Sequence, residues 1–396
     1  NEMQHILVRH EQGATHAADG YARATGKPGV VMLTSGPGAT NAITGIATAF
    51  MDSIPMVVIS GQVQSHLIGT DAFQETDMIG ISRPIVKHSF TVDSQENIPK
   101  IIKEAFYIAT SGRQGPVVID IPKDLTNPDD LFEFEYPKTA NIRSYNPPIE
   151  PSESQIDRVI DALINSSKPV IYAGGGTIAS NASDELIELN DIINAPITNT
   201  LMGLGVYPGT HKNFLGMLGM HGTYQANMAM HNADLILAIG ARFDDRITNT
   251  PDKFAPSAKI VHFDVDHSSV SKIIEADIAV FGQVKNSLKL LNKKLKASEN
   301  KFSETKYSPW HEQIAEWRNA HGLDHNLYKN HDDNSPILPQ AAVQQIYQSS
   351  NGEAYVTSDV GQHQMFAAQY YHFNKPRRWI NSGGLGTMGF GLPAAM

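Results

Sequence analysis

Short apolar runs alternate along the chain with longer segments whose apolar residues recur at helical spacing. In the first third, the runs lie at residues 6–9, 29–33, 55–60 and 116–121, and helical patterns lie at 12–24 and 39–50. Further runs lie at 169–173, 235–239, 259–264 and 278–281. This alternation is typical of parallel sheets covered by helices, so the sequence predicts an α/β fold.

Two segments of different composition divide this pattern. Prolines are spread over residues 128–151, which is typical of a linker, and the lysine-rich residues 289–306 are expected to form the end of a helix and a second linker. Helical patterns at 153 onward, 310–317 and 340–348, and an apolar run at 354–357, fall outside these segments. We therefore expect three parallel-sheet α/β domains, at residues 1–127, 150–298 and 308–396, with the first and third incomplete.

Both ends of the chain are expected to be truncations. Residues 1–4 lead almost at once into an apolar run without a signal-peptide pattern. The last residues, 394–396, fall inside a helix that Gly391, Leu392 and Pro393 should open. A natural domain seldom ends in mid-helix, because the last turn would lack its cap.

Composition and charge exclude several classes of protein. The chain has 396 residues and a net charge of −10, which argues against a surface that binds nucleic acid. It contains no cysteine, so it has neither disulfides nor thiolate metal sites. No apolar run approaches the length that would span a bilayer. The histidines show no supported metal-ligand spacing.

A carboxylate and two glycine-rich segments are the first candidates for chemistry. Glu11 should open a helix, and from position alone it is an ordinary residue of the first helical turn. Residues 34–41 follow an expected strand and lead into a helix, and residues 382–393 contain five glycines in twelve positions. Glycine at that density favours a close approach of backbone to a ligand.

Five runs in order carry a specific resemblance. They lie at residues 8–14, 34–41, 69–75, 361–365 and 383–393. Together they resemble the catalytic subunit of acetohydroxyacid (acetolactate) synthases, a family of thiamine-diphosphate enzymes, over essentially the whole chain. The resemblance implies the three-domain fold of those enzymes.

The resemblance implies a thiamine-diphosphate site. Glu11 would hydrogen-bond the aminopyrimidine ring and favour the tautomer whose exocyclic nitrogen removes the proton from the thiazolium carbon. The other residues implied for this cofactor are Pro37 and Asn41 around the pyrimidine, Val360, Gly361, Gln362 and His363 near the diphosphate, and Gly386 and Met388, the last as an apolar wedge that holds the cofactor bent. The Mg²⁺ ligands of the family would lie beyond Met396.

The resemblance also implies FAD, with no net redox role in the main reaction. By sequence alone, the glycines at 174–176 are only a weak nucleotide-turn signal. The residues implied for FAD are Arg113, Gly174, Gly175, Leu218, Gly219, Met220, His221, Gly240, Ala241, Arg242, Asp244, Asp264, Val265, Gly282 and Gln283.

Substrate handling is implied for four further residues. Phe73, Gln74 and Lys123 match family positions near the mouth of the active site, and Arg246 matches an arginine that holds a 2-oxoacid carboxylate. The alternative for Arg246 is an ordinary surface ion-pair cluster with its neighbours. Gln64 departs from the proline of many plant and fungal relatives, which leaves inhibitor sensitivity open.

The resemblance implies decarboxylation of pyruvate and transfer of the hydroxyethyl unit to pyruvate or 2-oxobutanoate, in branched-chain amino-acid biosynthesis. A pyruvate oxidase-like enzyme is one alternative. Another is that these residues alone form an inactive fragment that binds FAD at most. The resemblance further implies a homodimer or tetramer, a small regulatory subunit and a cytoplasmic location, although organellar targeting stays open.

Overall fold

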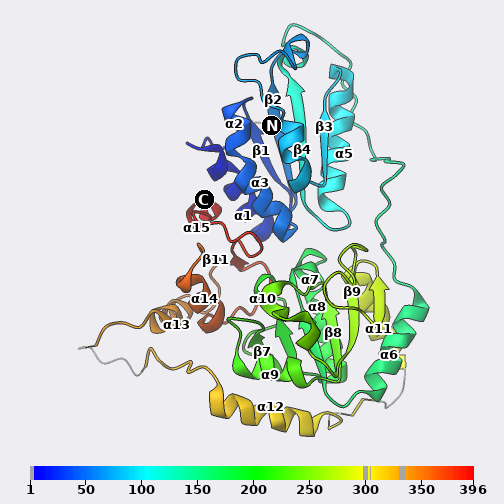
Figure 1. Ribbon diagram of the computed structural model, residues 1–396, viewed down its shortest axis with the longest axis vertical. Coiled ribbons are helices and arrows are strands. Elements are labelled where there is room, and N and C mark those ends of the chain that lie inside the picture. The colour runs from blue at the N-terminus through cyan, green and yellow to red at the C-terminus, as the bar shows by residue number, and fades with distance from the viewer. Residues whose placement is uncertain (1–3, 298–301, 304, 330–334) are drawn as a thin grey trace. The chain divides into compact units, whose positions relative to one another are not determined.

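The computed structural model describes residues 4–297, 302–303, 305–329 and 335–396. The chain divides into two compact units (Figure 1). Unit 1 contains residues 1–146, 357–360 and 380–396, and unit 2 contains residues 147–356 and 361–379. The final segment of the chain thus contributes to both units, and the three predicted domain boundaries stay a prediction.

Unit 1 is built on a four-stranded sheet in the order β1-β2-β4-β3, whose strands all run parallel. Its strands are β1 (Gly29–Leu33), β2 (Met56–Gln62), β3 (His88–Thr91) and β4 (Pro116–Pro122). Its helices are α1 (Glu11–Thr25), α2 (Pro37–Asn41), α3 (Ile43–Asp52), α4 (Met78–Ser82), α5 (Ile98–Thr110) and α15 (Gly391–Ala395).

Helices cover both faces of this sheet because its central strands are apolar on both sides. Met56 and Val58 of β2 pack with α1 and α3, whereas Val57 packs with α5 on the opposite face. Successive side chains of a strand point to opposite faces, so a continuous apolar run fits a strand that is buried on both.

Unit 2 contains a six-stranded sheet in the order β10-β9-β8-β5-β6-β7, with parallel pairing throughout. Its strands are β5 (Pro169–Ala173), β6 (Ile197–Asn199), β7 (Phe214–Met217), β8 (Leu235–Ile239), β9 (Lys259–Asp264) and β10 (Ile278–Phe281). Its helices are α6 (Glu153–Asn165), α7 (Gly175–Ala179), α8 (Ser183–Ile193), α9 (Tyr224–Asn232), α10 (Asp245–Thr248), α11 (Val284–Ala297), α12 (Ser308–His321), α13 (Pro339–Ser349) and α14 (Gln362–Tyr370).

Two apolar layers enclose the sheet of unit 2. Helices α6, α8 and α11 pack on one face, with Ile171 of β5 in the same layer. Helices α9 and α12 pack on the other, with Val170 and Tyr172 of β5. A two-stranded sheet, β11 (Val356–Thr357) and β12 (Trp379–Ile380), stands where the chain passes between the units.

The parallel α/β fold is confirmed, but one predicted strand is wrong. Residues 6–9 form no strand, and the side chains of Ile6 and Leu7 are 73% and 89% exposed. Among the described residues, no strand pairs with the free edge of β1, so this apolar run has no neighbour with which to form a ladder. The helix end predicted within residues 289–306 is confirmed, because α11 ends at Ala297, and residues 298–301 and 304 of the predicted linker lie outside the described residues.

Candidate active site

Apart from Glu11, which begins α1, the predicted site segments of unit 1 follow the carboxyl ends of its strands. Residues 34–41 follow β1, residues 64–75 follow β2, and Lys123 follows β4. Because these three strands are parallel neighbours, their carboxyl ends form one edge of the sheet. Ligands of open α/β sheets bind outside this edge, so these segments lie where a cofactor or substrate would bind.

Glu11 stands in the first turn of α1 and is held by a neighbouring loop. The Nδ2 atom of Asn41 donates a hydrogen bond of 3.0 Å to Oε2 of Glu11. A Cβ atom at Gly38 would lie 3.4 Å from Oε1 of Glu11 and 2.6 Å from Cγ2 of Thr34, so glycine gives the turn room beside the carboxylate. The hydrogen bond from Asn41 lowers the pKa of Glu11, which therefore accepts hydrogen bonds as a carboxylate at neutral pH.

The turn at residues 34–41 also contacts the loop that carries Phe73 and Gln74. Gly36 has φ +60°, and a Cβ atom there would lie 2.7 Å from the carbonyl oxygen of Gln74. The Glu75 carboxylate closes this loop by accepting hydrogen bonds from the backbone N–H groups of Gly69 and Ala72. The structure thus brings Glu11, Asn41 and Gln74 into one region, and it leaves Phe73 89% exposed.

A buried pair beneath this loop was not predicted from the sequence. The Nε2 atom of Gln62 donates to Oδ2 of Asp120 at 3.0 Å and to the carbonyl oxygen of Thr76 at 2.8 Å. Burial raises the pKa of Asp120 to about 6. Nearby, the Asp124 carboxylate accepts a 2.8 Å hydrogen bond from the N–H of Ser65, next to the exposed Lys123. These contacts join the segments that follow β2 and β4.

The predicted diphosphate residues are divided between the units. Val360 belongs to unit 1, whereas Gly361, Gln362 and His363 form the exposed start of α14 in unit 2. In unit 1, the Asp359 carboxylate accepts hydrogen bonds from the N–H groups of Val360 (2.9 Å) and Gly389 (2.8 Å). Asp359 is thus a residue that the sequence analysis missed, and it connects Val360 with the glycine-rich segment.

Gly386 and Met388 lie on that segment. Gly386 has φ +68°, a conformation that glycine adopts without strain. The side chain of Met388 is 78% exposed, which is unusual for a methionine, so it does not serve as a core residue of unit 1.

In unit 2, the strand order reverses direction between β5 and β8. The chain proceeds from β5 to β6 and β7 on one side and from β8 to β9 and β10 on the other. Such a switch point opens a crevice at the carboxyl ends of the two central strands, where open α/β sheets bind ligands. Gly174 and Gly175 follow β5 there, and Gly240, Ala241 and Arg242 follow β8.

The glycines at the switch point allow two turns to touch. A Cβ atom at Gly174 would lie 2.3 Å from the carbonyl oxygen of Gly240, and the N–H of Gly176 donates to that oxygen at 3.0 Å. Gly240 itself has φ +59°. These glycines are therefore explained by contact between the turns, in which the N–H groups of Gly174, Gly176 and Gly240 already donate to backbone oxygens.

Two other predicted segments of unit 2 meet after β7. The N–H of Met220 donates to the carbonyl oxygen of Arg246 at 2.9 Å, and a Cβ atom at Gly219 would lie 2.6 Å from the same oxygen. Asn227, which the sequence analysis missed, binds both the N–H and the C=O of Gly219 at 3.0 Å. The side chain of Leu218 is buried in the core, whereas those of Met220 and His221 are exposed.

The structure is compatible with both interpretations of Arg246, a ligand-binding residue and a member of a surface ion-pair cluster. Arg246 lies 3.6 Å from Asp245, and both side chains are more than two-thirds exposed, so the attraction between them is screened. The guanidinium is thus accessible to a ligand. Asp244 caps α10, accepting a hydrogen bond from the N–H of Arg246 at 3.1 Å, and burial raises its pKa.

The remaining predicted FAD residues lie in three places. Asp264 ends β9 and Val265 follows it, while Gly282 and Gln283 follow β10, so both pairs stand at the same carboxyl edge. The N–H of Gly282 donates to the carbonyl oxygen of Asp264 at 3.3 Å. Arg113 belongs to unit 1, where its Nε donates to Oγ of Ser53 at 2.9 Å.

Two searches of the described residues gave no candidates. No helix there is both long and apolar enough to cross a membrane. No group of three or more histidine or acidic side chains in that part of the chain is arranged to hold a metal ion.

Comparison with known proteins gives three matching family models. The model of the N-terminal TPP-binding domain of thiamine pyrophosphate enzymes matches residues 1–81. The model of the central domain of these enzymes matches residues 156–291, and that of the C-terminal TPP-binding domain matches residues 359–396.

Three similar full-length proteins are named acetolactate synthases. The acetolactate synthase large subunit of Buchnera aphidicola (subsp. Schizaphis graminum) is 57% identical over 394 residues, which cover 100% of this chain and 68% of that protein. The acetolactate synthase isozyme 3 large subunit of Escherichia coli K12 is 54% identical with the same coverage. Acetolactate synthase 1, chloroplastic, of Nicotiana tabacum is 44% identical over 100% of this chain and 58% of that protein.

Proposed function

This chain belongs to the acetolactate synthase large-subunit family of thiamine pyrophosphate enzymes, and we propose that it catalyses decarboxylation of pyruvate and transfer of the two-carbon unit to pyruvate or 2-oxobutanoate. The single observation that supports this best is the Glu11 carboxylate, held by Asn41 at the carboxyl edge of the unit 1 sheet. The relatives reported above are acetolactate synthases, which favours this reaction over the pyruvate oxidase alternative. The products serve the biosynthesis of branched-chain amino acids.

The residues of unit 1 fit thiamine diphosphate. When bound, this cofactor supplies the carbon centre that attacks the carbonyl group of the 2-oxoacid. Glu11 would accept a hydrogen bond from the pyrimidine ring, and Pro37 and Asn41 would line that ring. Gly386 would offer backbone, the exposed Met388 would supply an apolar contact, and Val360 would approach the diphosphate. The role implied for Gly361, Gln362 and His363, which belong to unit 2, stays a prediction.

The edge of the unit 2 sheet fits a dinucleotide such as FAD. Its strand order places the glycine turns after β5 and β8 at the switch point, where open α/β sheets bind such ligands. We propose that Gly174, Gly175 and Gly240–Arg242 contact FAD there. Leu218, whose side chain is buried, would contribute backbone. The family's flavin does no net redox work, so FAD here does not make the protein an oxidoreductase.

Substrate, metal and partners complete the proposal. Arg246, whose guanidinium is exposed, would bind the carboxylate of the second 2-oxoacid through two parallel hydrogen bonds. Phe73, Gln74 and Lys123 would line the entrance to the active site. Mg²⁺ would bind the cofactor's diphosphate. A regulatory subunit and a homodimer or tetramer are proposed from the relatives, whose names identify them as large subunits. A cytoplasmic location stays a prediction.

The experiment is the substitution Glu11→Gln in the native gene product, assayed for acetolactate with thiamine diphosphate, Mg²⁺ and FAD present. The amide keeps the shape but cannot take a proton, so kcat should fall by about 10²-fold or more. Glu96→Gln is the matched control, because Glu96 also stands in the first turn of a helical segment of unit 1. Near-normal turnover of Glu11→Gln would refute the role of this residue, and a wild-type protein that forms no acetolactate would refute the function.

A further inference from the structure

Helix α1 buries a stripe of polar side chains. Gln12, His16, Asp19 and Arg23 are spaced so that they share one face of the helix, and the last three are at most 6% exposed. Burying polar groups is unfavourable unless each finds a partner. The groups that hydrogen-bond to these side chains therefore show which segments this face of α1 holds in place.

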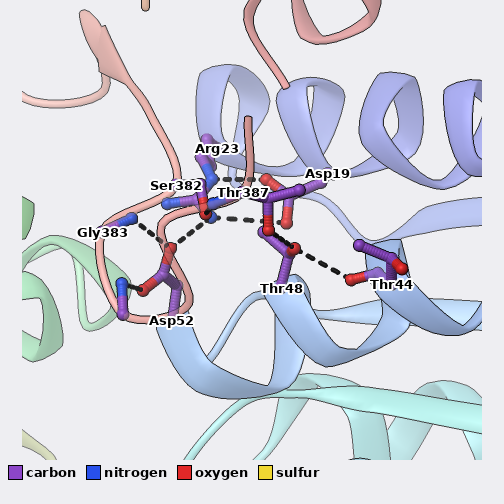
Figure 2. A network of polar contacts seen from close by, with 9 residues as sticks. Asp19, Arg23, Thr44, Thr48, Asp52, Ser382, Gly383 and Thr387 are labelled. Atoms are coloured by element: carbon purple, nitrogen blue, oxygen red, sulfur yellow. Dashed lines mark hydrogen bonds and ion pairs between the residues drawn. The ribbon is translucent and has the colours of Figure 1, made fainter. Parts of the chain in front are cut away.

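Arg23 joins two carboxylates in the interior of unit 1 (Figure 2). Its Nε donates to Asp19 on the same helix, and its Nη2 donates to Oδ2 of Asp52, at the end of α3, at 2.8 Å. The three side chains are at most 4% exposed. Burial alone would lower the pKa of Arg23, but the carboxylates of Asp19 and Asp52 raise it above the usual range. The guanidinium is thus permanently charged and ties α1 to α3.

The same carboxylate of Asp52 binds the backbone of the glycine-rich loop, which we define as residues 382–389. It accepts hydrogen bonds from the N–H of Gly383 at 2.9 Å and of Gly384 at 2.6 Å (Figure 2). A Cβ atom at Gly384 would lie 2.9 Å from Oδ1 of Asp52, so the loop approaches the carboxylate closely. These contacts join residues more than three hundred positions apart in the sequence.

A second, uncharged anchor fixes the other end of the loop. The hydroxyl of Thr48 donates to the carbonyl oxygen of Thr44, so the 2.7 Å contact between Thr48 and Thr387 must be donated by Thr387. The N–H of Thr387 donates to Oγ of Ser382 at 2.9 Å, which closes the loop on itself. The base of the loop is therefore buried, while Leu385 and Met388 at its tip stay 44% and 78% exposed.

We propose that Asp52 and Arg23 are positioning residues that hold the glycine-rich loop in the conformation in which it binds thiamine diphosphate. This inference rests on the proposed function, because the loop carries Gly386 and Met388. A pair of apolar side chains could pack α1 on α3 equally well. A carboxylate, however, binds two successive N–H groups at once, and this fixes the direction of the loop backbone before a ligand arrives.

The test compares Asp52→Asn with wild type in the native gene product. The amide has the shape of the carboxylate but can accept only through one atom, so one of the two loop N–H groups loses its partner. Without cofactor, the loop peptide should exchange its amide hydrogens faster than in wild type. Titration with thiamine diphosphate and Mg²⁺ should show binding weakened by about tenfold or more. At saturating cofactor, kcat should recover towards wild type, which a general loss of structure would not allow.

Two further variants keep the test decisive. Gly384→Ala pushes the loop away from Asp52 without leaving a buried charge unpaired, so it should weaken cofactor binding even if Asp52→Asn folds poorly. Asp93→Asn is the control, because it removes an exposed carboxylate of unit 1 whose side-chain partner is the neighbouring Asn97. It should change neither the amide exchange of the loop nor the binding of thiamine diphosphate.

The outcomes separate this inference from the proposed function. If Asp52→Asn and Gly384→Ala bind thiamine diphosphate as wild type does, or loosen the loop without weakening binding, the network is only structural and the inference is wrong. If the wild-type protein binds no thiamine diphosphate, the proposed function itself fails. Binding of FAD should be unchanged in all variants, because its proposed residues lie almost entirely in unit 2.

Discussion

Both sheets carry candidate binding residues at the carboxyl ends of the strands, but unit 1 presents side chains there, whereas the two central strands of unit 2 lead into glycine turns. In unit 1, the region is defined by the Glu11 carboxylate and the Asn41 amide, and a buried ion cluster binds the glycine-rich loop. In unit 2, glycine turns touch one another through Gly174 and Gly240.

This difference assigns different chemistry to the two units. A side chain can hold or move a proton at a defined atom, as the reaction proposed for unit 1 requires. A glycine turn can only present N–H groups and shape, which suits a ligand that is bound but not transformed. We therefore expect that substitutions that remove a charge lower stability most in unit 1, and that substitutions that add volume beside a glycine turn weaken ligand binding most in unit 2.

The largest effect on stability is expected from Arg23→Leu. This change leaves the carboxylates of Asp19 and Asp52 buried without their cation, which should lower the free energy of unfolding of unit 1 by about 3–5 kcal/mol. Denaturant unfolding, with amide exchange of α1 and α3 peptides, measures it. The matched control is Lys375→Met in unit 2, whose ion pair with Glu353 is about half exposed and should contribute less than about 1 kcal/mol. Equal effects of the two changes would contradict the comparison.

A smaller loss is expected from Gly240→Ala at the switch point of unit 2. The added methyl group would lie 2.6 Å from the N atom of Thr177, and φ +59° is unfavourable for alanine. Strain and overpacking should together cost about 2–4 kcal/mol in unit 2 and weaken FAD binding. Gly13→Ala in α1 is the control, since no atom lies within 4 Å of its Cβ and alanine favours helix. Unchanged FAD affinity in Gly240→Ala would remove these turns from the proposed site.

The sequence predicted four of the six strands in the sheet of unit 2, and it missed β6 and β7 there and β3 in unit 1. The strands at 169–173, 235–239, 259–264 and 278–281 have the predicted bounds, because strands buried on both faces are continuous apolar runs. Residues 6–9 are equally apolar but lack a neighbouring strand, and apolar composition alone cannot supply one. The predicted helix at 39–50 is two helices, α2 and α3, with Ala42 between them.

The sequence could indicate site segments but not the contacts that hold them. The glycine-rich runs and Glu11 were recognisable as motifs, whereas the bond between Asp52 and Gly383 joins residues that only the tertiary fold brings together. One signal was available: Asp19 and Arg23 stand four residues apart on the face of α1 that also carries His16. Polar residues on a face that should be buried indicate a polar partner, although not its identity.

The smallest effect expected here concerns acid stability, in which the two units should behave alike. His16 in unit 1 and His372 in unit 2 each have a pKa lowered to about 4, in both cases first by burial. For His16, the charge of Arg23 adds to this effect and Asp359 opposes it. The unfolded chain binds a proton at these histidines near pH 6.5, whereas the folded chain does so only near pH 4, so stability falls as the pH drops through this window.

His16→Gln should therefore flatten the pH dependence of unfolding of unit 1 between about pH 6.5 and 4, removing a loss of about 1–2 kcal/mol after allowance for solvent screening. His372→Gln should do the same for unit 2 and leave the exchange of α1 peptides unchanged. The measurement is amide exchange of peptides from each unit at several pH values. An unchanged slope in His16→Gln would mean that the acid sensitivity of unit 1 comes from another group, such as the carboxylates of Glu11 or Asp124, whose lowered pKa values also make stability fall with the pH. The buried carboxyls of Asp19 and Asp120 cannot be that group, because their pKa values are raised in the folded state and they therefore stabilise unit 1 in acid.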